Sequence, residues 1–265
     1  MDISSRPDPT EPPAARPLTI AVAGGTGVVG RHVVEVAHER GHQVVVLARS
    51  EGVDLTTGDG LAPRLTGVDA VVDVTGTFAQ QRAESEAFFG GVTRTLLAAE
   101  REAGVGHHVV LSIVGVDDVP SGYYAGKRLQ ERLVAQQAPA VPWSILRATQ
   151  FHEFAGQALG FARFGPVSVV PRMLSRPVAA LEVAQALVDL VEHGPAGRVP
   201  DLAGPEQHRI AHLARRVSLA RGLGRVVVEV PLPGAAGLAM RRGALLPVDD
   251  GPRGALSFDQ WLAEA

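Results

Sequence analysis

A single lysine and one of only two tyrosines stand four residues apart in this chain. Lys127 is the one lysine beside 24 arginines, and Tyr123 precedes it by four positions. Positions i and i+4 share a helix face, so the pair can place a phenol beside an ammonium group. A nearby cation lowers the pKa of a tyrosine, which suits it to donate a proton to a carbonyl under reduction. The pair predicts acid–base chemistry; an ordinary helix with a surface lysine is the alternative.

A glycine-rich loop near the start of the chain predicts a nucleotide-binding site. It reads Gly24-Gly25-Thr26-Gly27-Val28-Val29-Gly30, between an apolar run and an amphipathic stretch. Such a spacing permits a tight turn, a close approach of backbone to a pyrophosphate, and close packing of helix on strand. The helix that follows then offers unpaired N–H groups and a favourable dipole to phosphates. A tight turn without a ligand is the alternative.

The residues after the second apolar run indicate which dinucleotide binds. A free ribose 2′-hydroxyl usually meets an acidic residue at this point. Here Arg49 and Ser50 stand there instead, and Arg31 follows the third glycine. Arginine and serine can make charge-assisted hydrogen bonds to a 2′-phosphate. We therefore favour NADP over NAD; the alternative is that Arg49 is a solvated charge and Glu51 serves the ribose.

The elements that must position these residues alternate between short apolar runs and longer amphipathic ones. We predict strands at 18–23, 43–48, 70–74, 109–112 and 144–146, a weak strand at 53–55, and helices at 28–40, 83–103 and 123–137. This alternation predicts βαβ units and an α/β fold with a doubly wound parallel sheet over residues 18–150.

Residues outside 18–150 show a different sequence pattern. Residues 1–17, with five prolines, are predicted to be a disordered tail. Residues 151–265 are predicted to form a small substrate-facing cap on the same sheet. There we expect helices at 151–164, 182–192, 210–221 and 258–264, the last capped by Ser257, and strands at 167–170, 199–203 and 226–230.

Composition narrows the class of protein. The formal charge is -3 and the arginines are scattered, so we expect no nucleic-acid partner. The chain has no cysteine, and its nine histidines lack ligand spacing, so we expect no metal site. No apolar stretch is long enough for a membrane span and no signal peptide is visible, so we expect a cytoplasmic protein with a small-molecule substrate. Monomer and homo-oligomer are equally compatible with the sequence.

Taken together, these motifs resemble the short-chain dehydrogenase/reductases, in particular the atypical or extended members of the NmrA-like kind. The resemblance runs from Leu18 to the C-terminus. Besides the glycine loop and the Tyr123/Lys127 pair, it rests on Leu47-Ala48-Arg49, Gly58-Asp59, Val74-Thr75-Gly76, Leu111-Ser112 and Leu146-Arg147-Ala148-Thr149-Gln150-Phe151. It implies a Rossmann-type fold that binds NAD(P).

The resemblance also implies roles for single residues. Asp59 would lie by the adenine, and Thr75 and Gly76 would line the adenosine ribose. Lys127 would grip the nicotinamide ribose and lower the pKa of Tyr123, the acid/base. The remaining roles are a substrate carbonyl oriented by Ser112 and a pocket lined by Gln150, Phe151 and His152. Tyr124 and His152 stay open as alternative proton donors, because Tyr124 also shares a helix face with Lys127 and a histidine has a suitable pKa.

These roles predict an NAD(P)H-dependent oxidoreductase that transfers hydride to or from a small carbonyl, quinone or enone. Two alternatives belong to other classes. One is an NmrA-like NADP(H)-binding redox sensor without turnover, and the other is an epimerase or isomerase that uses the dinucleotide transiently. The retained Tyr123/Lys127 pair favours the enzyme over the sensor.

Overall fold

The computed structural model describes residues 16–264. The predicted disordered tail therefore lies outside the described residues, except for Arg16 and Pro17. Arg16 forms an ion pair with Asp69, with 2.6 Å between Nη2 and Oδ1, and Thr19 donates its backbone N–H to the same carboxylate. Contacts with the rest of the fold therefore begin at Arg16, two residues before Leu18, where the ordered part of the chain was predicted to start.

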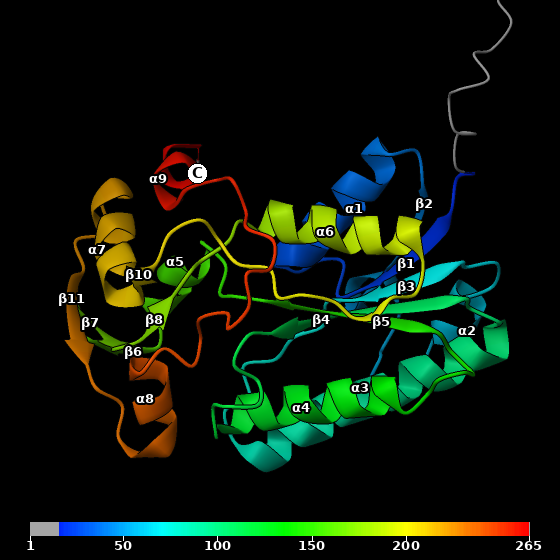
Figure 1. The fold of residues 1–265 in the computed structure, drawn as a ribbon, viewed down its shortest axis with the longest axis horizontal. Coiled ribbons are helices and arrows are strands. Elements are labelled where there is room, and N and C mark those ends of the chain that lie inside the picture. The colour runs from blue at the N-terminus through cyan, green and yellow to red at the C-terminus, as the bar shows by residue number, and fades with distance from the viewer. Residues whose placement is uncertain (1–15, 265) are drawn as a thin grey trace, which may run out of the picture.

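Six parallel strands form the central sheet, in the order β2-β1-β3-β4-β5-β9 (Figure 1). Their bounds are β1 (Thr19–Ala23), β2 (Gln43–Leu47), β3 (Ala70–Asp73), β4 (His107–Ile113), β5 (Trp143–Ala148) and β9 (Gly197–Arg198). Strand β2 lies on one side of β1. Strands β3, β4, β5 and β9 follow in sequence order on the other side of β1. The predicted doubly wound α/β sheet is confirmed, and its strand order reverses between β1 and β3, where such sheets bind ligands.

Helices cover both faces of this sheet (Figure 1). Helices α1 (Val28–Glu39) and α6 (Ala180–His193) pack together on one face, and α3 (Arg82–Ala103) and α4 (Gly122–Ala135) pack together on the other. A glycine permits the second contact, because a Cβ added at Gly126 would lie 2.2 Å from the Ser85 hydroxyl oxygen. Within residues 16–264, no helix is both long and apolar enough to cross a lipid bilayer.

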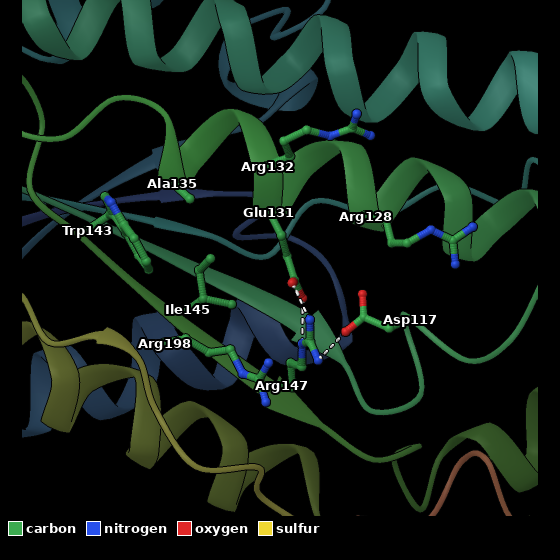
Figure 2. A pocket seen from close by; sticks show the side chains of 9 residues that line it. All are labelled: Asp117, Arg128, Glu131, Arg132, Ala135, Trp143, Ile145, Arg147 and Arg198. Carbon is green, nitrogen blue, oxygen red and sulfur yellow. Dashed lines mark hydrogen bonds and ion pairs between the residues drawn. The ribbon is translucent and has the colours of Figure 1, made fainter.

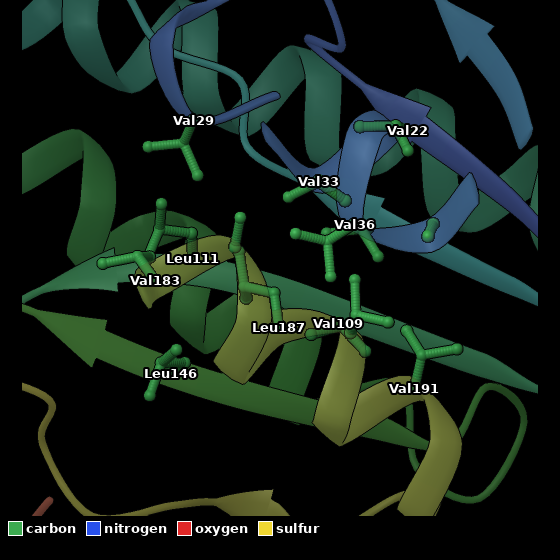
Figure 3. Packing of buried hydrophobic residues seen from close by; sticks show 14 of the residues in the cluster. Val22, Val29, Val33, Val36, Val109, Leu111, Leu146, Val183, Leu187 and Val191 are labelled. Atoms are coloured by element: carbon green, nitrogen blue, oxygen red, sulfur yellow. The ribbon is translucent and has the colours of Figure 1, made fainter. Parts of the chain in front are cut away.

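A cluster of aliphatic side chains packs α1 and α6 against the sheet (Figure 3). Val33 of α1 and Leu187 of α6 are completely buried, opposite Val109 of β4. Each such side chain contributes roughly 1.5–3 kcal/mol by leaving water. This cluster holds α1, and with it the glycine loop that precedes α1, at a set position on the sheet.

The C-terminal part adds a second, smaller layer. Strands β11 (Val226–Val230), β7 (Val167–Pro171) and β6 (Ala162–Phe164) form one sheet, and β8 (Leu174–Ser175) pairs with β10 (His208–Arg209). The helices here are α5 (Phe154–Ala158), α7 (Ile210–Ala220), α8 (Gly234–Arg241) and α9 (Phe258–Glu264), and two short elements, η1 (Arg49–Glu51) and α2 (Leu61–Arg64), lie earlier in the chain. The predicted Ser257 cap is confirmed as a capping box, since Ser257 and Gln260 each accept a hydrogen bond from the other's backbone N–H.

Three predicted elements are wrong. The helix expected at 151–164 shrinks to α5, since Gly156 and Gly160 disfavour helix and the chain turns into β6. The strand expected at 199–203 is reduced to isolated bridges, because Pro200 cannot donate to a ladder. The strand expected at 53–55 is only a bridge between Asp54 and Asp59.

Candidate active site

The glycine loop turns tightly between β1 and α1. Gly24 has a φ of +81°, a conformation that side chains disfavour, and its N–H donates to the Leu47 carbonyl at 3.1 Å. The Gly27 N–H then donates to the Gly24 carbonyl at 2.9 Å, which closes the turn. A Cβ added at Gly30 would lie 2.1 Å from the Gly24 oxygen. Gly24 and Gly30 are thus both required by the local backbone.

The start of α1 is open to an anion. Gly27 occupies the N-cap position, and no side chain caps the helix. A Cβ added at Gly27 would meet only the Gly24 oxygen, at 3.2 Å, and one added at Gly76 would meet nothing within 4 Å. A helix start with free N–H groups and bare glycine around it suits a pyrophosphate. The residues present therefore fit an NAD(P) cofactor.

The residues predicted to meet a 2′-phosphate are all at the surface. Arg49 and Ser50 begin η1, two residues beyond the Leu47 carbonyl that binds the glycine loop, and both are exposed, as is Arg31. The pKa of Asp54 is lowered, chiefly by hydrogen bonds from Thr56 and also by the charge of Arg49. Glu51, the alternative partner for a ribose, is exposed in the same short helix.

The predicted adenosine residues lie on two separate segments. Asp59 is exposed in a turn where its N–H donates to the Thr57 hydroxyl at 3.2 Å. Gly60 follows with a φ of +73°, and a Cβ there would lie 2.3 Å from the Gly52 oxygen, which explains a glycine at this position. Thr75 is buried directly beside Gly24, where an added Cβ would lie 3.2 Å from the Thr75 Cα.

Tyr123 lies in the first turn of α4, in apolar surroundings. Its ring packs edge-on against Phe89, with ring centroids 5.6 Å apart, and against Tyr124 at 6.0 Å. Burial raises the pKa of Tyr123 to about 12. The prediction that Lys127 lowers this pKa is therefore wrong for the protein without ligands. The pKa of Tyr124 is also raised, mainly by burial and by Tyr123, although a hydrogen bond with Gln150 opposes this.

Lys127 points into the protein and is only 5% exposed. Its ammonium group donates to the Leu111 carbonyl and to Gln130 Oε1, both at 2.9 Å, so neither bond goes to Tyr123. The Phe89 ring lies beneath it, 4.5 Å from Nζ to the ring centroid. Burial lowers the pKa of Lys127 to about 8, although Asp73 and Glu131 act in the opposite direction.

Asp73 and Gln130 belong to this site, although neither was predicted from the sequence. Gln130 Nε2 donates to Asp73 Oδ2 at 2.8 Å, and both side chains are completely buried. A signal was present in each case. Asp73 is the one charged residue in an apolar strand, and Gln130 lies three positions after Lys127, on the same helix face.

Ser112 carries an unpaired hydroxyl at the carboxyl end of β4. Its side chain is 4% exposed, and within the described part of the chain its Oγ has no hydrogen-bond partner. A buried donor without a partner costs about 1–3 kcal/mol, so such groups call for an explanation. A substrate carbonyl beside it would satisfy the hydroxyl, as the resemblance implies.

The predicted pocket residues diverge after β5. Gln150 is buried beside Tyr124, and its Oε1 accepts a hydrogen bond from Ser175. Phe151 packs against the aliphatic cluster under α1 and α6. His152 is buried under α9, with its Nε2 at 3.0 Å from the Leu256 carbonyl and its ring near Phe258. Its surroundings are those of a packing residue, and its contact with substrate stays a prediction.

A charged hollow of about 430 Å³ lies between α4 and β5, apart from this site (Figure 2). Arg147 dominates it and is held by two carboxylates: it donates to Glu131 at 2.8 and 2.6 Å and pairs with Asp117 at 2.9 Å. A second hollow of about 320 Å³ is lined by Leu18, Gly104 and others at the far end of the strands. Neither hollow is lined by any residue of the glycine loop or by any predicted site residue.

Comparisons with known proteins agree with this geometry. A family model described as NAD(P)H-binding matches residues 24–194. The (4-alkanoyl-5-oxo-2,5-dihydrofuran-3-yl)methyl phosphate reductase of Streptomyces griseus subsp. griseus is 30% identical over 224 residues, which cover 78% of this chain and 74% of that protein. The chloroplastic divinyl chlorophyllide a 8-vinyl-reductase of Zea mays is 26% identical, over 83% of this chain and 63% of that protein.

A solved structure shows the same fold. The dTDP-glucose 4,6-dehydratase DesIV of Streptomyces venezuelae, with NAD and TYD bound, superposes with a TM-score of 0.72. It is 19% identical, and the match covers 93% of this chain and 95% of that one. At this identity the likeness concerns the fold alone.

Proposed function

We propose that this chain, which belongs to a family described as NAD(P)H-binding, is an NADPH-dependent reductase of a small carbonyl, quinone or enone. The observation that carries this proposal is the pair of groups at the carboxyl end of β4. There the Leu111 carbonyl holds a buried ammonium group, and Ser112 presents an unpaired hydroxyl. The two relatives named above are both reductases, which supports reduction over epimerisation.

Each residue has a defined task in this proposal. A bound reduced nicotinamide supplies the hydride to the electrophilic carbon of the substrate. Tyr123 donates its phenolic proton to the oxygen that gains charge, and Ser112 donates a hydrogen bond to the same oxygen. Lys127 keeps one of its three N–H groups free for a ribose hydroxyl.

The raised pKa of Tyr123 sets a condition on this chemistry. A phenol with a pKa of about 12 is a weak acid, and a cation beside it would lower that pKa and make it a better proton donor. The nearest cation on the same helix is Lys127, whose ammonium is bonded to Leu111 and Gln130. We therefore propose that the ammonium and the phenol approach each other when cofactor and substrate fill the site.

The preference for NADP is part of the proposal. Arg49, Ser50 and Arg31 are exposed near the end of β2 and the start of α1, and no acidic residue stands at the tip of β2. An arginine beside a phosphate forms strong, charge-assisted hydrogen bonds. NADPH should consequently bind more tightly than NADH.

A redox sensor that binds NADP(H) without turnover is the second candidate. It is favoured by the same local geometry: the hydrogen bonds of Lys127 go to Leu111 and Gln130, and burial keeps Tyr123 protonated. In that case the cofactor would bind and no substrate would be reduced.

One experiment separates the two candidates. NADPH oxidation is followed against a panel of quinones, aldehydes and enones, with cofactor affinity measured on the same protein. Turnover of any compound, at a rate that the Ser112→Ala variant does not reach, supports the reductase. Tight NADPH binding with no turnover across the panel favours the sensor, and no binding of either dinucleotide contradicts both.

A further inference from the structure

A continuous chain of buried hydrogen bonds runs behind the candidate active site. Thr75 donates its backbone N–H and its hydroxyl to Asp73 Oδ1, at 2.9 and 2.7 Å. Asp73 Oδ2 accepts from Gln130 Nε2 at 2.8 Å, and Gln130 Oε1 accepts from Lys127 Nζ at 2.9 Å. These hydrogen bonds therefore join Thr75, beside the glycine loop, to Lys127 on α4.

The amide of Gln130 is the central link. One end of the amide is a donor and the other is an acceptor, so it can face a carboxylate and an ammonium group at once. With Gln130 between the two charges, the ammonium uses one bond to Leu111 and one to the amide, and one N–H is left over.

We propose that Gln130 is a positioning residue, which holds the Lys127 ammonium beside the Leu111 carbonyl, where the proposed function places the nicotinamide ribose, and couples it to the Asp73 carboxylate. This inference rests on the proposed function for the place of Lys127 beside the cofactor. It goes beyond that function because it assigns a role to Gln130 and Asp73, to which that function gives no contact with cofactor or substrate.

Every charged or polar group that faces Lys127 bears on this role. Strand β3 contributes Asp73, α4 contributes Gln130 and Glu131, α3 contributes the Phe89 ring, and β4 contributes the Leu111 carbonyl. The carbonyl, the amide and the ring all favour the charged amine, as do the two carboxylates. Burial opposes them, so the amine is held near the midpoint of its titration at about pH 8.

A histidine lies close to the same carboxylate. His108 of β4 is buried, and Asp73 helps Glu100 to raise its pKa. The charge of Asp73 thus raises the pKa of both His108 and Lys127, but only Lys127 is linked to Asp73 by hydrogen bonds through Gln130. A change at Gln130 should consequently alter Lys127 and leave the His108–Glu100 pair intact.

Because Lys127 is the only lysine, its titration can be observed directly. Protein labelled with ¹³C at the lysine ε-carbon gives one lysine resonance, and its pH dependence reports the pKa of Lys127 without assignment. Gln130→Met removes both polar ends at similar size, and Gln130→Glu replaces the amide with a carboxylate. We expect the pKa to fall by about 1 in Gln130→Met and to rise by a similar amount in Gln130→Glu.

Gln136→Met is the matched control, since Gln136 is exposed at the end of the same helix. It should leave the lysine titration unchanged. A residue that merely packs would shift the pKa in the same direction in both Gln130 variants, or in neither, and either result overturns the proposal. Because the two variants differ in charge, the opposite signs cannot arise from a general loosening of α4.

The cofactor provides an independent readout. Saturation with NADPH should move the Lys127 resonance of the unaltered protein, and Gln130→Met should weaken NADPH binding about tenfold, the loss expected for one misplaced charge-assisted hydrogen bond. An unmoved resonance at saturation contradicts the proposed function, while the titration without cofactor still tests Gln130. Normal affinity in Gln130→Met, together with a moved resonance in the unaltered protein, overturns the positioning role.

Discussion

The two faces of the central sheet are buried by different kinds of side chain. Under α1 and α6 the core cluster is aliphatic, with Val33, Val109 and Leu187 among its members (Figure 3). The polar pairs on this side, His107–Ser144 and His42–Glu192, lie at the amino ends of the strands. Under α3 and α4, charged and polar groups are buried among the apolar ones, including Asp73 and Lys127. At the carboxyl ends of the strands, one face is packed by aliphatic side chains and the other holds ionisable groups in place.

This difference identifies the face of the sheet on which burial of charged groups lowers the stability of the fold. Burying an unpaired charge is costly, so buried charges persist where partners are supplied. The face under α3 and α4 supplies them through bonds between distant segments, such as Gln130 to Asp73 across 57 positions. The aliphatic cluster under α1 and α6 needs no such partners and holds α1, whose preceding glycine loop would bind a cofactor through its backbone rather than through side chains.

The largest effect should come from breaking a buried pair on the charged face. Glu100 and His108 are both completely buried, with His108 Nδ1 at 2.9 and 3.0 Å from the two carboxylate oxygens. Glu100→Gln should lower the free energy of unfolding by about 4 kcal/mol, since it removes the carboxylate that accepts the hydrogen bond of the buried His108 ring and raises its pKa. Chemical denaturation measures this loss, with the exposed Glu102→Gln on the same helix as control.

The loss should also depend on pH. Burial alone would lower the pKa of His108, but Glu100 and Asp73 outweigh it and raise the pKa. A raised pKa gives stability that is complete below the ordinary histidine value and is lost as pH rises through the folded-state value. The difference between the two proteins should therefore be larger at pH 6 than at pH 9. A difference that grows with pH would contradict this pairing.

On the aliphatic face, an effect of similar size should carry no pH dependence. Leu187→Ala leaves a cavity between α6 and the sheet and should cost about 3 kcal/mol of unfolding free energy at any pH between 6 and 9. Leu181→Ala, on an exposed position of α6, is the control. A marked pH dependence in Leu187→Ala would remove the distinction between the two faces.

Turnover should depend on the hydroxyl of Tyr123, in helix α4. Tyr123→Phe removes the phenolic proton and keeps the ring packed on Phe89, so the rate constant for any substrate found should fall about 100-fold while NADPH affinity is kept. Tyr124→Phe is the matched comparison, and steady-state kinetics measure both. If Tyr124→Phe shows the larger loss, the acid is Tyr124.

Local features of the fold and the site could be predicted from the sequence. The glycine loop, Arg49 after β2 and the spacing of Tyr123 and Lys127 are each encoded within a few residues, as are α6, α7, β11 and the Ser257 cap. Their physics is local: backbone turns, periodicity and capping. The parallel sheet followed from the same alternation of apolar runs.

Features that depend on distant contacts could not be predicted. Spacing puts Tyr123 and Lys127 on one helix face, but the hydrogen bonds of Lys127 are set by Leu111 and Gln130, and the pKa of Tyr123 is set by burial against Phe89. The C-terminal part was predicted least well. There short strands and glycines such as Gly160 interrupt the helical pattern, and strand pairing is decided by partners far away in sequence.

The smallest effect concerns the choice of dinucleotide, and it tests the surface beside the aliphatic face. Arg49→Ala should reduce the preference for NADPH over NADH about tenfold, roughly 1.4 kcal/mol, because one charge-assisted contact to the 2′-phosphate is lost. Fluorescence titration with both dinucleotides gives the ratio, and Arg101→Ala, an exposed arginine at the end of α3, is the control. Since Arg49 is exposed, added salt should weaken NADPH binding in the unaltered protein more than in the variant. If Arg49→Ala leaves the preference intact, the 2′-phosphate is bound instead by Arg31, an exposed cation at the start of α1. The variant Arg31→Ala should then show the loss.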